Sequence, residues 1–143
     1  MVEMKIAAEE LRGAALQLLM NVGVSQEDAQ IVVSHLLETH LTGRDFLGLP
    51  WLPATIEWIK NQVINPKPQI RIIRETLAAA LMDGDNGIEE VVGMKAMQLA
   101  VEKASRYGIG IVNVSDSNSL EMLGFYAKYA AEKGVIGLVV TNS

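Results

Sequence analysis

The chain has 143 residues and a formal net charge of −5 at pH 7, and 50% of its residues are hydrophobic against 20% charged. This length supports one compact core, and the apolar fraction excludes a disordered chain. The acidic balance argues against a nucleic-acid partner, whose binding surface would be basic. Cysteine is absent, which excludes disulfides, thiolate metal ligands and thiol catalysis.

The sequence contains no candidate membrane segment. Its longest hydrophobic runs are residues 77–82 and 135–140, whereas a spanning helix needs about 20 apolar residues. The first residues also lack the basic and apolar regions of a signal peptide. We therefore expect a cytoplasmic protein with no membrane partner.

Residues 1–66 are predicted to form a helical region. Apolar residues from Ala7 to Val22 recur at helical spacing, and Gly23 suits the position that ends such a helix. Ser25 is a typical N-cap for a second helix that ends before Gly43. A third helix begins near Pro53. The inner face of the second helix is predicted to contain Ala29, Val32, Val33, Leu36, Leu37 and Leu41.

Residues 67–143 are predicted to form the α/β part of the same domain, with a mixed sheet. The expected elements are strands at 70–74 and 78–83, a turn at 84–87, a helix at 89–106, a strand at 109–114, a helix at 120–133 and a strand at 135–141. Strand, helix and strand joined by short links predict a βαβ unit with parallel strands. The fold class is therefore α/β.

The spacing of the two histidines along the sequence argues against a shared metal site. His35 and His40 are five residues apart, which separates them by about 140° around a helix, so they cannot share one ion. We predict that His40 lies beside the apolar stripe and that His35 faces solvent. No metal site is predicted.

Two glycine-containing motifs favour local structure over ligand binding. Gly108-Ile-Gly110 precedes a strand and lacks a third glycine, so a helix cap and strand entry are favoured over a dinucleotide loop. Asp83–Gly87 has Gly87 where a calcium loop needs an oxygen ligand. A turn is favoured there.

The loop at residues 46–52 is unusually apolar for a loop. It contains Phe46, Leu47, Leu49, Trp51 and Leu52. Loops normally face water. So many apolar side chains within seven residues are therefore expected to pack against another surface. Two alternatives stay open: the loop packs under the helices of its own domain, or it is a docking surface.

Several motifs occur in a characteristic order along the whole chain. They are Leu41-Thr-Gly43-Arg-Asp45-Phe-Leu-Gly48, Ile64-Asn65-Pro66, Asp83-Gly-Asp-Asn-Gly87, Val91-Val92-Gly93, Ser117-Asn118, Gly124-Phe-Tyr126-Ala127, Ile136-Gly137 and Thr141-Asn-Ser143. This series resembles the N-terminal part of the malate/L-lactate dehydrogenase family of the second type. That family includes ureidoglycolate, sulfolactate and diketogulonate oxidoreductases. The resemblance covers all 143 residues and less than half of a usual family chain.

The resemblance implies a homodimeric fold distinct from the Rossmann type, an NAD or NADP cofactor, and a small 2-hydroxy or 2-oxo acid as substrate. The family pattern has Ser-His-Gly where this chain has Phe46-Leu47-Gly48, arginine at Trp51, and Asn-His at Asn118-Ser119. No catalytic residue is therefore carried over. Ser143 matches a residue that touches the cofactor, and it is the one site residue that the resemblance implies.

Two functional hypotheses follow. In the first, the chain is the N-terminal portion of a family dehydrogenase, truncated at its C-terminal end and with little activity alone. In the second, it is a non-catalytic or engineered derivative that acts as a folded interaction or oligomerisation module. A homo-oligomer is expected in both.

Overall fold

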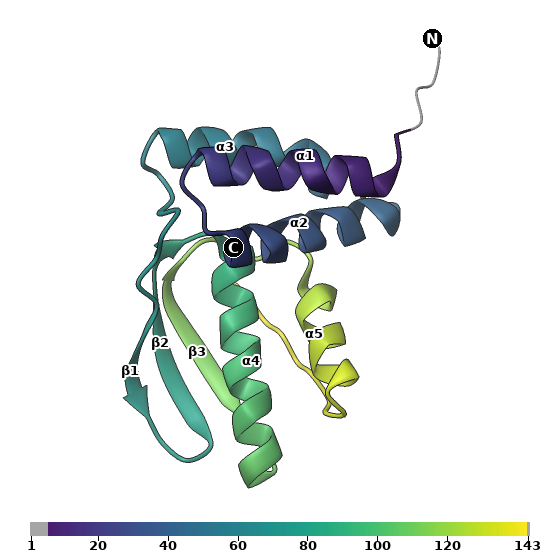
Figure 1. Cartoon of the computed structure of the whole chain (residues 1–143). Helices are drawn as coiled ribbons and strands as arrows, with labels where there is room; N and C mark the ends of the chain where they lie inside the picture. Colours follow the sequence, from purple (N-terminus) through teal and green to yellow (C-terminus); the bar gives the residue numbers. More distant parts are fainter. Residues whose placement is uncertain (1–5, 143) are drawn as a thin grey trace.

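The computed structural model describes residues 6–142. In Figure 1 the helices of the N-terminal part of the chain lie above the small sheet and the later helices. In chain order the elements are α1 (Ala8–Asn21), α2 (Gln26–Leu41), the 3₁₀ turns η1 (Asp45–Leu47) and η2 (Leu49–Trp51), α3 (Leu52–Lys60), β1 (Arg71–Glu75), β2 (Ala79–Gly87), α4 (Glu89–Tyr107), β3 (Ile111–Ser117) and α5 (Leu123–Glu132).

The sheet is mixed and has the order β1-β2-β3. β1 pairs antiparallel with β2, whereas β2 and β3 are parallel and are connected through α4. The predicted α/β class and the presence of a βαβ unit are therefore confirmed. Its members are β2, α4 and β3, however, and not the segments 109–114, 120–133 and 135–141 whose short links indicated it. Met82 of β2 packs with Val92 and Ala96 of α4 in a small apolar cluster, so α4 covers one face of the sheet.

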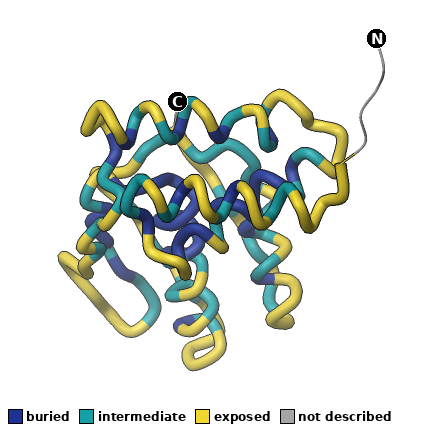
Figure 2. Tube along the Cα trace, turned by 45° about the horizontal axis from the view of Figure 1, so that its top comes forward, coloured by how far each residue is buried: buried dark blue, intermediate teal, exposed yellow. Residues whose placement is uncertain are grey.

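Helix α2 lies between two layers, with α1 and α3 on one side and α4 and α5 on the other (Figure 1). The dark-blue buried stretches of the trace accordingly gather in the middle of the molecule (Figure 2). The main apolar core contains residues of α1, α2, α3 and α4, and none of α5. Its buried residues are Ala15, Leu19, Val24, Ala29, Val32, Val33, Leu36, Leu37, Leu52, Ile59, Ile64, Ile88 and Val91.

The buried polar residues of α2 were not predicted. Asp28, Val32, His35 and Thr39 are all buried, and their spacing of four, three and four residues places them on one helix face. Asp28 pairs with Lys95 of α4 at 3.0 Å, and the Thr39 hydroxyl contacts Met122 just before α5. The prediction that His35 faces solvent is therefore wrong: its exposed fraction is 1%.

Other predictions about the ends of elements also need correction. Leu41 is 72% exposed and not buried, because it lies at the last residue of α2. Pairing of β2 resumes at Gly87 after an irregularity that follows Asp83, so the predicted turn at 84–87 is part of the strand. The predicted strand at 135–141 is not formed, because no strand pairs with it within residues 6–142.

The apolar loop at residues 46–52 divides into two parts. Leu49, Trp51 and Leu52 pack on the main core, and the Trp51 ring meets the Trp58 ring edge-on at 5.6 Å between centroids. Packing under the domain's own helices is thus confirmed for this half. Phe46, in contrast, is 72% exposed, so the docking alternative stays a prediction for that residue.

Gly108 and Gly110 have the structural roles predicted for them. Gly108 ends α4 with φ +82° and donates its N–H to the Ala104 carbonyl at 2.8 Å. A Cβ on Gly110 would lie 1.9 Å from the Ala100 carbonyl oxygen, so only glycine allows β3 to start this close to α4. Among the described residues, no helix is long and apolar enough to cross a membrane.

Gly110→Ala is expected to destabilise the fold, because backbone must move to admit the methyl group. We expect a loss of about 2–4 kcal/mol in the free energy of unfolding by urea titration. Gly124→Ala is the matched control, since it lies in α5 with nothing within 4 Å of its added Cβ. Alanine there should stabilise by about 0.4–1 kcal/mol. Equal losses in both variants would contradict this account.

Trp51→Ser is expected to cost about 1–3 kcal/mol, because it removes the contact with Trp58 and part of the core packing. Phe46→Ser should change stability by no more than about 0.5 kcal/mol, since that ring is exposed. Thermal and urea unfolding of both variants measure the difference. A large loss for Phe46→Ser would show that its ring is covered in solution.

Candidate functional site

A network of polar side chains lies at the carboxyl ends of β2 and β3. It comprises the irregular last part of β2, residues 83–87, and the end of β3 with the residues after it, 116–119; we call these two segments the carboxyl-edge loops. The Asp85 carboxylate accepts hydrogen bonds from the Asn65 side chain at 2.9 Å and from the Gln69 N–H at 2.8 Å. The Asp83 carboxylate accepts from Arg71 at 2.8 and 3.0 Å and from the Asp85 N–H at 2.9 Å. These bonds hold the loops in one conformation.

Asn118 joins the two carboxyl-edge loops. Its side-chain NH₂ donates to the Gly87 carbonyl at 2.9 Å and lies 3.4 Å from the Asn86 side-chain oxygen. Asp85, Asn86 and Asp116 all have φ near +50°, a conformation that L-residues adopt rarely. The hydrogen bonds above involve Asp85 and Asn86. Ligands of α/β folds typically bind outside the carboxyl ends of parallel strands, so this edge is the candidate site.

Electrostatics exclude Asp83 as the base of this site. The Asp85 N–H and then the Arg71 guanidinium hold the pKa of the Asp83 carboxyl below its usual value. A carboxylate stabilised in its charged form is a weak proton acceptor near neutral pH. Asp83 therefore anchors β1 to β2, and its role is structural.

A second polar cluster is buried at the junction of α2, α4 and α5. It consists of His35, Glu89, Glu90 and Tyr126, with exposed fractions of 1–3%. His35 Nδ1 and Glu90 Oε1 are 3.5 Å apart, and neither His35 nitrogen makes a well-formed hydrogen bond. The His35 ring packs edge-on against Phe125 at 5.0 Å and tilted against Tyr126 at 5.9 Å.

The environment of this junction cluster raises the pKa of Glu89 and of Tyr126. Burial, and then the neighbouring Glu90 carboxyl, raise the pKa of Glu89 to about 8. The same causes raise the pKa of the Tyr126 hydroxyl. Because these groups are enclosed by three helices, they can hold a proton but cannot contact a substrate. Helical spacing on α2 was the signal that could have placed His35 there.

The two positions at which the family pattern has histidine lie apart in the chain. Leu47 lies in η1 beside the end of α2, whereas Ser119 is exposed after β3. His40, predicted to lie beside the apolar stripe of α2, is half-buried. Ser143, the predicted cofactor-binding residue, lies outside the described residues. Among residues 6–142 no group of three or more His, Cys, Asp or Glu side chains is arranged to hold a metal ion.

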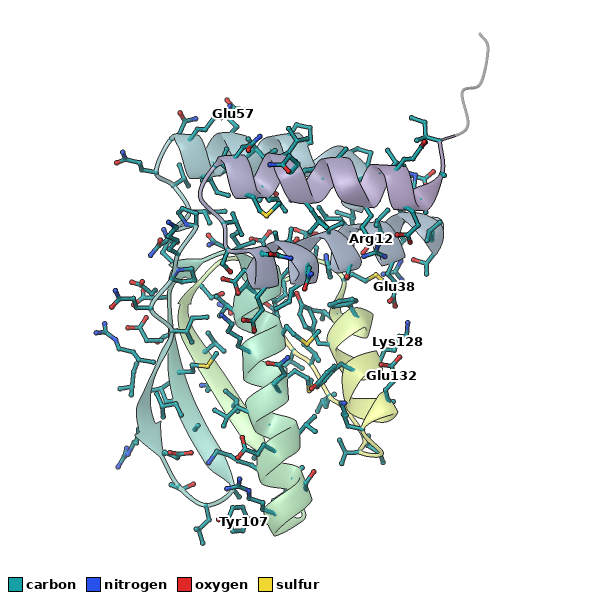
Figure 3. All side chains as sticks on the ribbon, in the orientation of Figure 1. Arg12, Glu38, Glu57, Tyr107, Lys128 and Glu132 are labelled. Atoms are coloured by element: carbon teal, nitrogen blue, oxygen red, sulfur yellow. The ribbon has the colours of Figure 1, made fainter. Side chains whose placement is uncertain are left out.

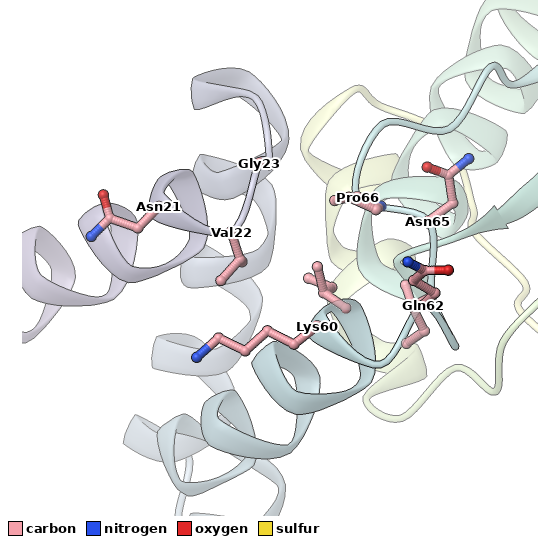
Figure 4. Close-up of a pocket in the computed structure, with 9 residues that line it drawn as sticks. Asn21, Val22, Gly23, Lys60, Gln62, Asn65 and Pro66 are labelled. Atoms are coloured by element: carbon pink, nitrogen blue, oxygen red, sulfur yellow. The ribbon is translucent and has the colours of Figure 1, made fainter.

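An open groove of about 640 Å³ lies between the ends of α1 and α3 (Figure 4). Lys60 is its one charged lining residue, and the other polar ones are the amides Asn21, Gln62 and Asn65. The groove therefore lacks an acid–base pair. It offers no catalytic chemistry.

Two helix N-termini among the described residues disfavour the phosphates of a dinucleotide. A helix N-terminus attracts phosphate through its free N–H groups and its dipole. The first turns of α1 and α2 already contain acidic pairs, Glu9 and Glu10 in α1, and Glu27 and Asp28 in α2. These carboxylates oppose an incoming phosphate, whereas the first turns of α3 and α5 contain no acidic residue.

Comparison with known proteins identifies clear relatives. The malate/L-lactate dehydrogenase family model matches residues 6–143. Malate dehydrogenase of Pyrococcus abyssi is 44% identical over 97% of this chain and 38% of its own length. L-sulfolactate dehydrogenase of Methanocaldococcus jannaschii is 36% identical over 98% of this chain and 41% of its own.

The solved structures agree with the sequence comparisons. Malate dehydrogenase from Pyrococcus horikoshii superposes with a TM-score of 0.89 and 38% identity, covering 92% of this chain and 38% of that chain. This chain thus spans about two fifths of the length of the relatives that it matches. The chain therefore has the same type of fold as the matching part of these dehydrogenases.

Glu89→Gln tests the proton linkage of the junction cluster. The ordinary pKa of Glu89 is 4.5 and its folded value is about 8. Between these values the folded protein keeps a proton that the unfolded chain has released. The stability that this group contributes therefore falls as the pH rises from about 4.5 to about 8.

The glutamine variant should lose this dependence. Above pH 8 it should exceed the parent in stability by on the order of 1–3 kcal/mol, because the buried charge is gone. Urea titrations between pH 5 and pH 9 measure the difference between variant and parent. Glu57→Gln, at an exposed position of α3 (Figure 3), is the control. Parallel profiles for the parent and Glu89→Gln would refute the linkage.

Proposed function

This chain belongs to the malate/L-lactate dehydrogenase family, and we propose that it forms the N-terminal part of a nicotinamide-dependent oxidoreductase of 2-hydroxy and 2-oxo acids. The observation that carries this proposal is the family match over residues 6–143 together with the TM-score of 0.89 to a malate dehydrogenase. The relatives' names give the substrate class. Malate and sulfolactate are both 2-hydroxy acids with a second anionic group on the neighbouring carbon.

Oxidation of such an acid requires two transfers. A hydride leaves the carbon that bears the hydroxyl, and NAD or NADP supplies the acceptor when it is bound. A proton leaves the hydroxyl oxygen, and a side chain with a pKa near neutrality is suited to receive it. Cationic groups hold the substrate carboxylate.

The residues of this chain contribute a framework to that chemistry. Asn118, through its bond to the Gly87 carbonyl, fixes the two carboxyl-edge loops relative to each other. Leu47 and Ser119, which match histidines in the family pattern, do not supply a base: leucine has no ionisable group, and Ser119 has no partner that would activate it within the carboxyl-edge hydrogen bonds described above. We infer that the chain alone turns over little or no substrate.

A second candidate function is a non-catalytic module that binds another protein or a copy of itself. The exposed Phe46 ring supports it, since Phe46 occupies a position at which the family pattern has serine. If this candidate is correct, joining the chain to the C-terminal part of a family dehydrogenase does not produce dehydrogenase activity. Homo-oligomerisation belongs to both candidates.

The dehydrogenase proposal is tested by joining this chain in frame to the C-terminal part of Pyrococcus horikoshii malate dehydrogenase. Reduction of NAD and NADP by malate, sulfolactate and lactate is followed at 340 nm. We expect background turnover for the chain alone. The unmodified hybrid should turn over about 10²–10⁴-fold more slowly than the intact Pyrococcus horikoshii enzyme but above background, because the histidine proton acceptors are absent.

The variant Leu47→His/Ser119→His of the hybrid should then gain about 10²–10⁴-fold, the usual contribution of general acid–base catalysis. Leu47→Gln/Ser119→Gln is the matched control, since it adds polar side chains that do not titrate. A folded histidine variant without activity would favour the non-catalytic module. Turnover by the chain alone would overturn the inference that it lacks a base.

A further inference from the structure

The junction cluster is adjacent in the chain to both carboxyl-edge loops. Helices α4 and α5 lie side by side beneath α2 (Figure 1). Glu89 begins α4 just beyond Gly87, whose carbonyl accepts the bond from Asn118. Residues 118–122, which we call the connecting segment, join β3 to α5, and α5 contributes Tyr126. A movement at the junction therefore reaches both partners of the Asn118–Gly87 bond.

Direct contacts attach the connecting segment to the helices around it. A Cβ at Gly93 of α4 would lie 2.8 Å from both the Leu120 Cδ2 and the Tyr126 Cε1, so these two side chains rest on the α4 backbone. Met122 accepts a hydrogen bond from the Thr39 hydroxyl of α2 at 2.9 Å. The connecting segment therefore cannot keep all of these contacts if α4 and α5 separate.

Titratable side chains from every element of the junction face one another. They come from α2, α4, the connecting segment and α5, and they are His35, Glu89, Glu90, Glu121 and Tyr126. Both His35 nitrogens, one oxygen each of Glu89 and Glu90, and the Tyr126 hydroxyl lack a well-formed hydrogen bond. An additional negative charge is costly here, because a buried charge needs a partner.

Basic residues on the neighbouring elements bind other carboxylates. Lys95 of α4 pairs with Asp28, and Lys128 of α5 pairs with Glu38. The carboxylates at the ends of the strands packed on α4 are Asp83, Asp85 and Asp116. Arg71 of β1 is bound to the first of these. These groups therefore supply no counter-ion for a second carboxylate in the junction cluster.

We propose that Glu89 is a proton-operated switch for the carboxyl-edge loops. With Glu89 protonated, α4 and α5 stay closed on each other, and Asn118 remains bonded to Gly87. When Glu89 releases its proton to solvent, its carboxylate repels that of Glu90, and the first turn of α4 separates from Tyr126 so that the charge reaches water. The connecting segment moves with α5, and the Asn118–Gly87 bond is lost.

The pH range of the switch follows from the surroundings of Glu89. Its ordinary pKa is 4.5, and burial, and then the Glu90 carboxyl, raise this pKa to about 8 in the closed form. Exposure to water returns the pKa toward 4.5, so each pH unit between these values favours the open form by up to about tenfold. Opening also breaks the contacts on Gly93, so we expect the midpoint in the upper half of this range. The proposal concerns the conformation of the chain and does not rest on dehydrogenase activity.

Carbon-13 NMR of the full 143-residue chain between pH 5 and pH 9 tests the proposal. The methyl resonances of Leu120 and Met122 report the contacts with α4 and α2, and the Gly87 carbonyl resonance reports its bond with Asn118. All three should move together with one midpoint. The methyl resonances of Leu18 in α1 should stay constant, because the rest of the fold remains intact.

Glu89→Gln should keep all three resonances at their acidic-pH positions up to pH 9, because glutamine does not ionise. Glu102→Gln is the matched control, since Glu102 is an exposed glutamate of the same helix. This control should retain the transition of the parent chain with the same midpoint.

Thr39→Val tests the switch with Glu89 in place, and it decides the question if Glu89→Gln does not fold. It removes the bond to Met122 from the closed form only, so opening requires less driving force. The midpoint should move toward acidic pH by roughly 0.3–1 pH unit. Thr42→Val, at the exposed end of α2, is the matched control and should leave the midpoint unchanged.

Four results would overturn the proposal. The first is constant Leu120 and Met122 resonances between pH 5 and pH 9. The second is a transition that persists in Glu89→Gln or that Thr39→Val does not shift. The third is a methyl transition without a change at the Gly87 carbonyl, which would confine the effect of the proton to the junction. The fourth is a transition that includes Leu18, which would show unfolding of the whole chain.

Discussion

The burial of α2 on two sides is the constraint on which the rest of the structure depends. One side packs with α1 and α3 in the main core, and the other faces α4 and α5. Because α2 is enclosed, polar residues on its second face must find partners inside the protein. Asp28 does so with Lys95, and Glu38, nearer the edge, pairs with Lys128 of α5 at 2.9 Å (Figure 3).

His35 is the residue on this face of α2 whose polar atoms are least well paired. It lies against Glu90 without a well-formed hydrogen bond, and Glu89 and Tyr126 also keep polar atoms without partners. Such a cluster costs stability, and the raised pKa of Glu89 is its electrostatic consequence. Protonation of Glu89 reduces the number of buried charges. The stability of the junction that positions α5 therefore depends on pH.

The position of α5 in turn determines what the following segment can do. Gly137 lies on Ala127 and Ala130, and this contact leaves Ile136, Leu138 and Val140 facing outward. The carboxyl-edge loops are also held in one conformation, through the hydrogen bonds of Asp83, Asp85 and Asn118.

Periodicity along the sequence determined the helices and the cap at Gly108, because each depends on neighbours within a few residues. The order of motifs also determined the family. Periodicity could not show that α2 is buried twice, since that depends on which helices pack against it. It predicted a strand at 135–141 from composition, but a strand exists only when another segment bonds to it. Tertiary structure alone therefore decided that His35 is enclosed and that Leu138 is left open.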